Sequence, residues 1–409
     1  MKRKLFLAVG GGIFAAALVI IMIGRTVMTN HLAADIQAVW DRGNVPLVLV
    51  LPMSGNYKYV GDLAHWAAVY AADEINAGGG INGRPVELIV QNTMSDTDNA
   101  RSIVKKAGGN ALLLIGPVTA PEALATAAQV HENGMIDIGT YSFAEGLAGA
   151  VPYGISYMSN SERGELACVK RWAGDHPDIR RVVIFSDSGD ASKTETAQTM
   201  VQSLPGLGLE VAGVVDIAAD GSDQRYVKCA IQALNLGADG YISLLSGTDY
   251  ANILVQLRRR GVDEGWRLTA SFSAYSAELI DIAQDALDGT YIWNKYDPSY
   301  DSSQWRALVE AYEKDHHGEL PRNNVIVDIY DSVMVSAQCF RSLNITGKPE
   351  NYDAEKDAIC QWFYGLESVD GIQGSYSWEN GEKIKDYVYF MFDGTEPVNI
   401  DRNPSHEND

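Results

Sequence analysis

Cysteine is scarce in this sequence of 409 residues, which contains four: Cys168, Cys229, Cys339 and Cys360. No two of them form a CxxC pair, so the spacing of a structural zinc site is missing, and four cysteines in so long a chain are no disulfide framework. The fold must therefore depend on apolar cores. A hydrophobic content of 46% excludes disorder, and 409 residues suffice for two domains with cores of their own.

Positive charge is also in short supply. The chain has 32 lysines and arginines against 53 aspartates and glutamates, which gives a formal net charge of -21 at pH 7. A surface of this sign repels the phosphates of nucleic acids and offers no basic stripe for the release of their counterions. We therefore expect no nucleic-acid partner.

Motifs that specify catalysis are missing as well. The sequence has no GxxxxGK[ST] phosphate-binding loop, no HExxH zinc motif, no GxSxG nucleophile elbow and no EF-hand calcium loop. The one pair of neighbouring histidines, His316 and His317, lies at the end of a predicted helix, where positive charge is favourable without any metal. The sequence therefore predicts neither an enzyme nor a cofactor or metal site.

The longest apolar run stands at the N-terminus. Three basic residues at positions 2–4 precede the uncharged residues 5–23, and Arg25 follows them. These 19 residues are enough to span a bilayer, so residues 1–25 are predicted to be an uncleaved signal anchor rather than a cleaved signal peptide. Because most of the positive charge precedes the run, we expect the N-terminus in the cytoplasm and the remainder of the chain outside it, anchored in the membrane by residues 5–23.

Beyond this segment, the pattern alternates between strands and helices. Residues 26–44 form a connector with helical periodicity, and the apolar run from Val45 to Leu51 is typical of a strand buried on both faces. The alternation predicts an α/β fold with two lobes, each built on a doubly wound parallel sheet. The expected ranges are 45–154 with 292–367 for lobe one, 155–291 with 368–395 for lobe two, and 396–409 for a polar tail.

The cysteines leave two alternatives. Cys339 and Cys360 lie on successive predicted helices, so outside the cytoplasm either a disulfide or two free thiols fit the pattern. Cys168 and Cys229 fall in helical patterns of lobe two, which favours two buried thiols over a bridge between them.

Several short motifs coincide between Leu47 and Ala100. They are Ser54-Gly55 in the turn after the first strand, Glu74-Ile75-Asn76 with Gly79-Gly80 at the end of a helix, Ile81-Asn82-Gly83-Arg84 before the second strand, and Ser95-Asp96 before the next helix. Ile115-Gly116-Pro117 and the segment 289–293 fit the same pattern. Over about residues 45–393, the chain resembles the solute-binding proteins of ATP-driven importers for branched-chain amino acids, amides and urea. The resemblance implies a type I periplasmic-binding-protein fold, in which two lobes joined by a three-segment hinge enclose a ligand.

The candidate binding residues lie in loops that follow strands, because ligands of doubly wound sheets lie beyond the carboxyl ends of the strands, near helix N-termini. Three of these residues, Thr119, Thr140 and Ser142, match the family positions whose hydroxyls hold a ligand carboxylate. The full candidate set is Ser54, Tyr57, Thr119, Thr140, Ser142, Asp187, Ser246 and Phe272. The competing interpretation is that such residues are helix caps, turn formers or, for Phe272, core.

One departure from the family concerns the group that holds the ammonium of an amino acid. The glutamate that commonly does so falls at or near Phe272 in this sequence. Either Asp187, Asp190 or Asp249 takes over its role, or the ligand lacks the ammonium, because a buried ammonium without a partner is strongly unfavourable.

The resemblance predicts an extracytoplasmic receptor that closes two lobes over a small polar ligand of the amino acid or amide type. Its partner would be the permease of an ATP-driven importer. The alternative is a membrane-anchored ligand sensor that uses the same fold for a signalling partner.

Overall fold

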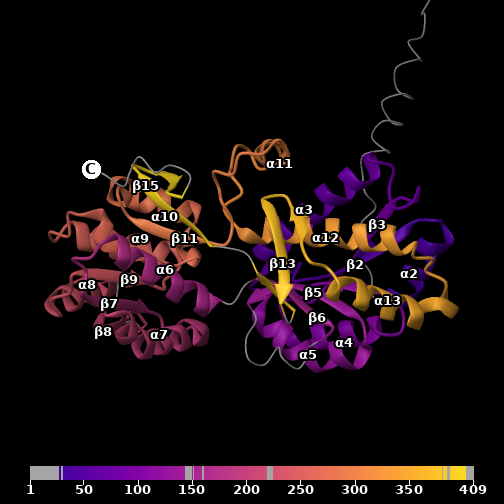
Figure 1. The fold of residues 1–409 in the computed structure, drawn as a ribbon, viewed down its shortest axis with the longest axis horizontal. Coiled ribbons are helices and arrows are strands. Elements are labelled where there is room, and N and C mark those ends of the chain that lie inside the picture. Colours follow the sequence, from indigo (N-terminus) through magenta and orange to yellow (C-terminus); the bar gives the residue numbers. More distant parts are fainter. Residues whose placement is uncertain are drawn as a thin grey trace, which may run out of the picture. The chain divides into compact units, whose positions relative to one another are not determined.

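The computed structural model describes residues 27–28, 31–142, 150, 152–158, 161–218, 224–379, 381–384 and 387–401. The chain divides into two compact units. Unit 1 comprises Met1–Met158, Val325–Val369 and Ser377–Lys383, and unit 2 comprises Ser159–Asn324, Asp370–Tyr376 and Ile384–Asp409 (Figure 1).

The first sheet carries most of unit 1. In the described residues its nine strands lie in the order β1-β3-β2-β4-β5-β6-β14-β13-β12, and the pairs from β1 to β6 are parallel. The strands are β1 (Val27–Met28), β2 (Val45–Leu51), β3 (Val86–Asn92), β4 (Leu113–Ile115), β5 (Ile136–Ser142), β6 (Gly154–Met158), β12 (Val369–Gly371), β13 (Gly374–Glu379) and β14 (Glu382–Ile384).

Helices cover both faces of this sheet, as expected for a doubly wound fold. On one face a shared apolar core joins the strands to α2 (Leu32–Asp41), α4 (Thr97–Ala107) and α5 (Ala120–Asn133). On the other face lie α3 (Lys58–Ala77) and α12 (Asn324–Leu343), which meet where Tyr330 donates a hydrogen bond to Glu74 at 2.9 Å. A further helix, α13 (Tyr352–Tyr364), follows α12 along the chain.

The second sheet belongs to unit 2. Its seven strands lie in the order β16-β15-β11-β10-β9-β7-β8, with parallel pairs from β11 to β8 and two antiparallel pairs at the other end. The strands are β7 (Arg181–Ser186), β8 (Glu210–Asp216), β9 (Gly240–Ser243), β10 (Leu268–Ala270), β11 (Tyr291–Asn294), β15 (Val388–Asp393) and β16 (Glu396–Asn399).

Its helices are α6 (Ser161–Asp175), α7 (Ala191–Ser203), α8 (Arg225–Asn235), α9 (Gly247–Arg258), α10 (Ala277–Ala283) and α11 (Ser303–Asp315). An apolar core contains Trp172 of α6 and Met200 of α7 together with Val182 and Ile184 of β7, the strand next to the edge strand β8. The two sheets and their helices confirm the predicted α/β fold class.

Four features differ from the sequence-based expectation. Residues 155–158 and 377–383, expected in lobe two, lie in unit 1, because β6, β13 and β14 belong to the first sheet. The expected connector contains α2, whose Leu32, Ile36 and Val39 are part of the unit 1 core. Residues 292–324, expected in lobe one, lie in unit 2, because β11 pairs with β10 and β15. Residues 396–399, expected in a polar tail, form the edge strand β16.

The four cysteines are free thiols, so the structure contains neither the Cys339–Cys360 nor the Cys168–Cys229 bridge. Burial raises the pKa of the Cys168 and Cys339 thiols and keeps both protonated at neutral pH. No helix among the described residues is long and apolar enough to cross a membrane. The segment 5–23 lies outside those residues, so the anchor stays a prediction.

Candidate ligand-binding site

Two loops of unit 1 are tied together at the carboxyl ends of β2 and β3. The side-chain amide of Asn92 donates to Ser54 Oγ at 3.0 Å, and Ser95 Oγ donates to the carbonyl of Ser54 at 2.8 Å. Ser95 Oγ also accepts the backbone N–H of Tyr57 at 3.0 Å. The structure thus brings Ser54 and Tyr57 together on one fixed loop, directly before the N-terminus of α3.

Aromatic rings on this loop face solvent. Tyr57 stands at the N-cap position of α3 without a side-chain capping bond, and its exposed fraction is 37%. The neighbouring Tyr59 is 61% exposed. An exposed ring beside a helix N-terminus is able to stack on a ligand. The same exposure is equally typical of a tyrosine that only forms part of a turn.

Thr119 is enclosed at the carboxyl end of β4. It is the N-cap residue of α5 and is 7% exposed, and its hydroxyl donates to Glu122 Oε2 at 2.6 Å instead of accepting from a backbone N–H. Glu122 is 1% exposed, and its Oε1 has no hydrogen-bond partner among the described residues. Sequence reasoning missed this carboxylate, although Thr-x-x-Glu is the spacing of a capping box.

Thr140 and Ser142 belong to the end of β5, the strand next to β4. Their side chains lie outside the described part of the chain. Their predicted contacts with a ligand carboxylate therefore remain a prediction.

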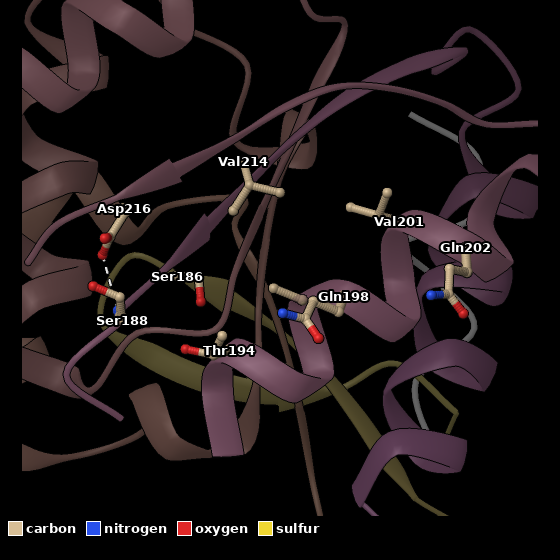
Figure 2. Close-up of a pocket in the computed structure, with 9 residues that line it drawn as sticks. Ser186, Ser188, Thr194, Gln198, Val201, Gln202, Val214 and Asp216 are labelled. Carbon is tan, nitrogen blue, oxygen red and sulfur yellow. Dashed lines mark hydrogen bonds between the residues drawn. The ribbon is translucent and has the colours of Figure 1, made fainter. Parts of the chain in front are cut away.

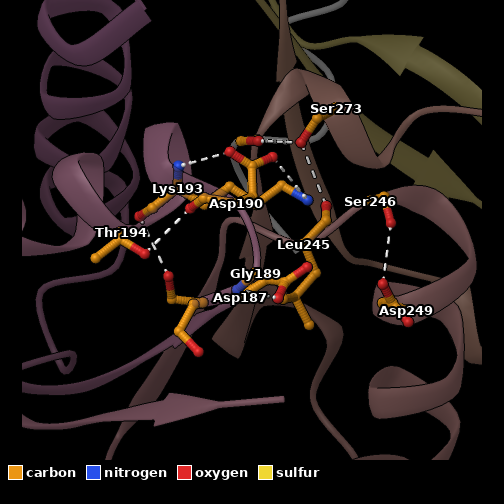
Figure 3. Close-up of polar contacts among 12 residues, drawn as sticks. Asp187, Gly189, Asp190, Lys193, Thr194, Leu245, Ser246, Asp249 and Ser273 are labelled. Atoms are coloured by element: carbon orange, nitrogen blue, oxygen red, sulfur yellow. Dashed lines mark hydrogen bonds and ion pairs between the residues drawn. The ribbon is translucent and has the colours of Figure 1, made fainter. Parts of the chain in front are cut away.

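In unit 2, the loop after β7 is a turn held by aspartates (Figure 3). Asp187 Oδ1 accepts the N–H of Gly189 at 2.9 Å. Asp190 Oδ1 accepts the N–H of Lys193 at 3.3 Å, and the Lys193 ammonium lies 3.8 Å from Asp190 Oδ2. Thr194 Oγ1 donates to the carbonyl of Asp190 at 3.1 Å.

The loop after β9 ends in a second carboxylate network. Ser246, the N-cap residue of α9, donates its hydroxyl to Asp249 Oδ2 at 3.1 Å. Asp249 Oδ1 accepts the hydroxyl of Tyr226 at 2.6 Å and lies 3.5 Å from Arg225 Nη2. Burial raises the pKa of Tyr226, and its hydrogen bond to Asp249 raises it further, so the phenol stays a donor. The sequence analysis did not identify Arg225 or Tyr226.

The loop after β10 places an aromatic ring beside a cation. Phe272 follows the strand in a short 3-10 turn, with its ring centroid 5.2 Å from that of Trp293. The ammonium of Lys295, directly after β11, lies 4.4 Å from the Phe272 ring centroid. In the same turn Ser271 and Ser273 share a hydrogen bond of 2.8 Å, and Ser273 donates to the carbonyl of Leu245 at 3.3 Å.

A separate pocket of about 390 Å³ lies between α7 and the strands β7 and β8 (Figure 2). Apolar side chains line it together with serine, threonine, glutamine and aspartate. The lining residues are Ser186, Ser188, Thr194, Ala197, Gln198, Val201, Gln202, Val214 and Asp216. Burial acts to raise the pKa of Asp216, but hydrogen bonds from Ser188 and Ala218 outweigh it, so the pKa lies below its usual value.

Metal ligation finds no support in the described residues, where no group of three or more histidine, cysteine, aspartate or glutamate side chains is placed to hold an ion. The loops instead combine hydroxyls, carboxylates, cations and aromatic rings at the carboxyl ends of parallel strands. This is chemistry for the reversible binding of a small polar molecule.

Comparison with solved structures shows the same fold in bacterial binding proteins. A leucine-binding protein from Thermotoga maritima matches with a TM-score of 0.68 at 20% identity, over 87% of this chain and 97% of its own. A branched-chain amino acid binding protein from Streptococcus pneumoniae, solved in complex with isoleucine, matches with a TM-score of 0.68 at 18% identity, over 87% of this chain and 97% of its own. A solute-binding protein from Rhodopseudomonas palustris, solved in complex with 3,4-dihydroxybenzoic acid, matches with a TM-score of 0.69 at 16% identity, over 87% of this chain and 95% of its own.

Among proteins with curated descriptions, none matches this chain significantly. The sequence model of the periplasmic binding proteins matches residues 44–392, which include most of both units and all the candidate loops. A match over most of the length establishes the family. This chain belongs to the periplasmic binding proteins, whose members are binding proteins and not enzymes.

Proposed function

We propose that this protein is the extracytoplasmic solute-binding receptor of an ATP-driven importer. The observation that carries the proposal is the family match over residues 44–392, which covers two α/β units. Both units present polar side chains and helix N-termini at the carboxyl ends of their parallel strands.

The proposed mechanism is hinge closure. One small polar ligand is bound by the loops of unit 1 and those of unit 2, so contacts from both units exist only in the closed form. That difference in affinity shifts the equilibrium toward closure. The closed form is then recognised by the permease subunits, while residues 5–23 hold the receptor at the inner membrane.

The proposed ligand is a small molecule of the amino acid or amide type or a related acid. Structures of similar fold have been solved with isoleucine and with 3,4-dihydroxybenzoic acid. The fold therefore accommodates ligands with and without an ammonium group, and the side chains in the loops decide between them.

A thermal-shift screen of the full-length protein tests the proposal. The panel contains amino acids, amides, urea, and aliphatic and aromatic acids. A ligand at about 1000 times its Kd stabilises the folded state by roughly 4 kcal/mol, which raises the Tm by several degrees. We expect at least one class to do so, and a screen in which no solute changes the Tm contradicts the receptor function.

A further inference from the structure

The pocket between α7 and the strands β7 and β8 lies at an edge of the unit 2 sheet. β8 is the last strand of that sheet and, among the described residues, it pairs only with β7. Val201 of α7 and Val214 of β8 both line the pocket, and each is 39% exposed although its side chain is aliphatic (Figure 2). The volume of about 390 Å³ falls within the range of small-molecule sites, about 300–1,000 Å³. The pocket is therefore open to solvent and large enough for a small organic molecule.

The pocket is elongated along α7. Thr194, Gln198 and Val201 line it at spacings of four and three residues, which place them on one face of the helix over a rise of about 10 Å. On the strand opposite, Val214 and Asp216 are two residues apart and share a face of β8. The apolar side chains therefore lie toward one end of the pocket, and the carboxylate and Thr194 toward the other.

Two hydroxyls at the polar end have already donated their hydrogens to the protein. Ser186 Oγ donates to the carbonyl of Lys193 at 3.2 Å, and Thr194 Oγ1 donates to the carbonyl of Asp190 at 3.1 Å. A hydroxyl has a single hydrogen, so each of these oxygens offers a ligand only its lone pairs. With the carboxylate of Asp216, which pairs with Ser186 across the strands, this end of the pocket presents three hydrogen-bond acceptors.

The negative charge of Asp216 has no cation of the protein beside it. Its Oδ1 accepts the backbone N–H groups of Ser188 and Ala218, at 2.9 and 3.0 Å, and these bonds hold its pKa below the usual value. Within the described part of the chain Asp216 forms no ion pair. Lys193, the one cation of α7, lies 3.8 Å from Asp190. An ionised carboxylate among acceptors favours a positively charged donor.

We infer that this pocket is a second binding site of the protein, for a small organic amine. The three N–H groups of the ammonium match the three acceptors, Asp216, Ser186 and Thr194, and the apolar body of the amine lies between Val201 and Val214. The inference goes beyond the proposed receptor function and does not depend on which solute that function serves.

The first test compares ligands that share an apolar body and differ in their polar group. Calorimetric titrations of the full-length protein at pH 7.5 use 2-phenylethylamine, 2-phenylethanol and phenylacetate, and in parallel 3-methylbutylamine, 3-methylbutanol and 3-methylbutanoate. The amine of at least one triplet is expected to bind, with one molecule per chain, at least tenfold more tightly than its alcohol and its acid. An alcohol or acid that binds as tightly as the amine of both triplets, or no binding of either amine, overturns the inference.

Variants at the polar end identify the groups responsible. Asp216→Asn is expected to weaken binding of the amine at least tenfold, because the charge is lost while an asparagine oxygen still accepts the two backbone N–H groups. Thr194→Val removes one acceptor and is expected to weaken binding severalfold, which gives an independent test should the first variant not fold. Glu195→Gln, an exposed residue of α7 outside the pocket, is the matched control for the loss of one negative charge and is expected to leave the affinity unchanged.

A third titration separates this pocket from the solute-binding loops. The amine is added to protein saturated with the solute that has the largest effect in the thermal-shift screen, and it is expected still to bind with one molecule per chain. Displacement of the amine by the solute overturns a second site, and so does equal affinity of wild type and Asp216→Asn for the amine. Neither result touches the receptor function, which fails only if no solute in the screen binds.

Discussion

Asp137 is a buried carboxyl group in the middle of the unit 1 sheet. It lies on β5, is 1% exposed, and neither of its side-chain oxygens has a hydrogen-bond partner among the described residues. Burial raises the pKa of Asp137 well above its usual range, because the ionised form loses its hydration. Ionisation of this residue therefore opposes folding.

We expect this residue to make stability fall as the pH rises. Below about pH 4 the carboxyl is protonated in both states, whereas above it the unfolded chain ionises while the folded chain keeps its proton, so the free energy of unfolding decreases up to the folded-state pKa. Asp137→Asn removes the ionisable group and with it this contribution to the pH dependence of stability. Urea unfolding is expected to show a gain of stability over wild type at pH 8 that shrinks toward pH 4.

The control is Asp281→Asn, a change at an exposed residue of α10, which is expected to alter stability equally at both pH values. A gain for Asp137→Asn that does not depend on pH contradicts an uncompensated carboxyl group at this position.

Thr119 and Ser246 show what residue patterns reveal about single positions. Both were expected as ligand contacts or helix caps because each follows a strand. In the structure each hydroxyl donates to the carboxylate three residues later, Glu122 and Asp249 respectively. The [ST]-x-x-[DE] spacing would have identified both partners. Tyr226 comes from a different helix, so no local pattern pointed to its bond with Asp249.

At the scale of elements, the turn between β2 and α3 depends on Gly55. Its φ of +87° is unfavourable for other residues, and a Cβ there would lie 2.5 Å from the carbonyl oxygen of Met94. Gly55 separates Ser54 from the chain that leads to Tyr57, so its conformation determines where both candidate residues lie.

Gly55→Ala is expected to destabilise the protein and to weaken ligand binding, because the loop must move. Gly83→Ala is the matched control, since Gly83 has a φ of +82° but nothing within 4 Å of the added Cβ. The control is expected to lose only about 1–2 kcal/mol of stability from the left-handed conformation, with binding retained. Urea unfolding measures the stability of each variant, and titration with the ligand measures its affinity. Equal losses of stability and affinity in the two variants would contradict the clash at Met94.

An ion pair in unit 1 connects three segments that are far apart in the sequence. Lys383 of β14 lies 3.3 Å from Asp328 of α12, with side chains 4% and 6% exposed, and 4.6 Å from the ring centroid of Tyr157 on β6. A buried charge that loses its partner is strongly unfavourable.

Lys383→Met is therefore expected to lower the free energy of unfolding by about 3–5 kcal/mol, because Asp328 is left buried without its cation. The double variant Asp328→Leu/Lys383→Met is expected to recover much of this loss. Urea unfolding of wild type, both single variants and the double variant gives the coupling energy, and strictly additive losses would contradict a paired interaction.

Periodicity predicted the individual elements better than their partners. The continuous apolar run Val45–Leu51 is the buried strand β2, and the helical spacing from Val60 onward lies in α3. The buried face of α3, however, consists mainly of glycine and alanine, while Trp66 and Tyr70 are half-buried and stack at 5.5 Å. Edge strand β16 was missed because three of its four residues, Glu396, Pro397 and Asn399, are polar or typical of turns.

For the whole molecule, the sequence predicted two lobes but could not locate every crossing between them. The sequence around β11 does not show which lobe the strand joins, and only its pairing with β10 and β15 assigns it to the second sheet. The pairing with β15 joins residues more than 90 positions apart, as Trp293 and Tyr389 are, and local patterns do not encode it.

Small-angle X-ray scattering with and without ligand tests the central claim most directly, that this two-unit protein is a receptor that closes over its solute. The ligand is the solute with the largest effect in the thermal-shift screen, at saturation established by calorimetry. The account predicts a smaller radius of gyration for the liganded protein, because contacts from both units stabilise only the closed form. An unchanged radius of gyration at proven saturation would contradict closure.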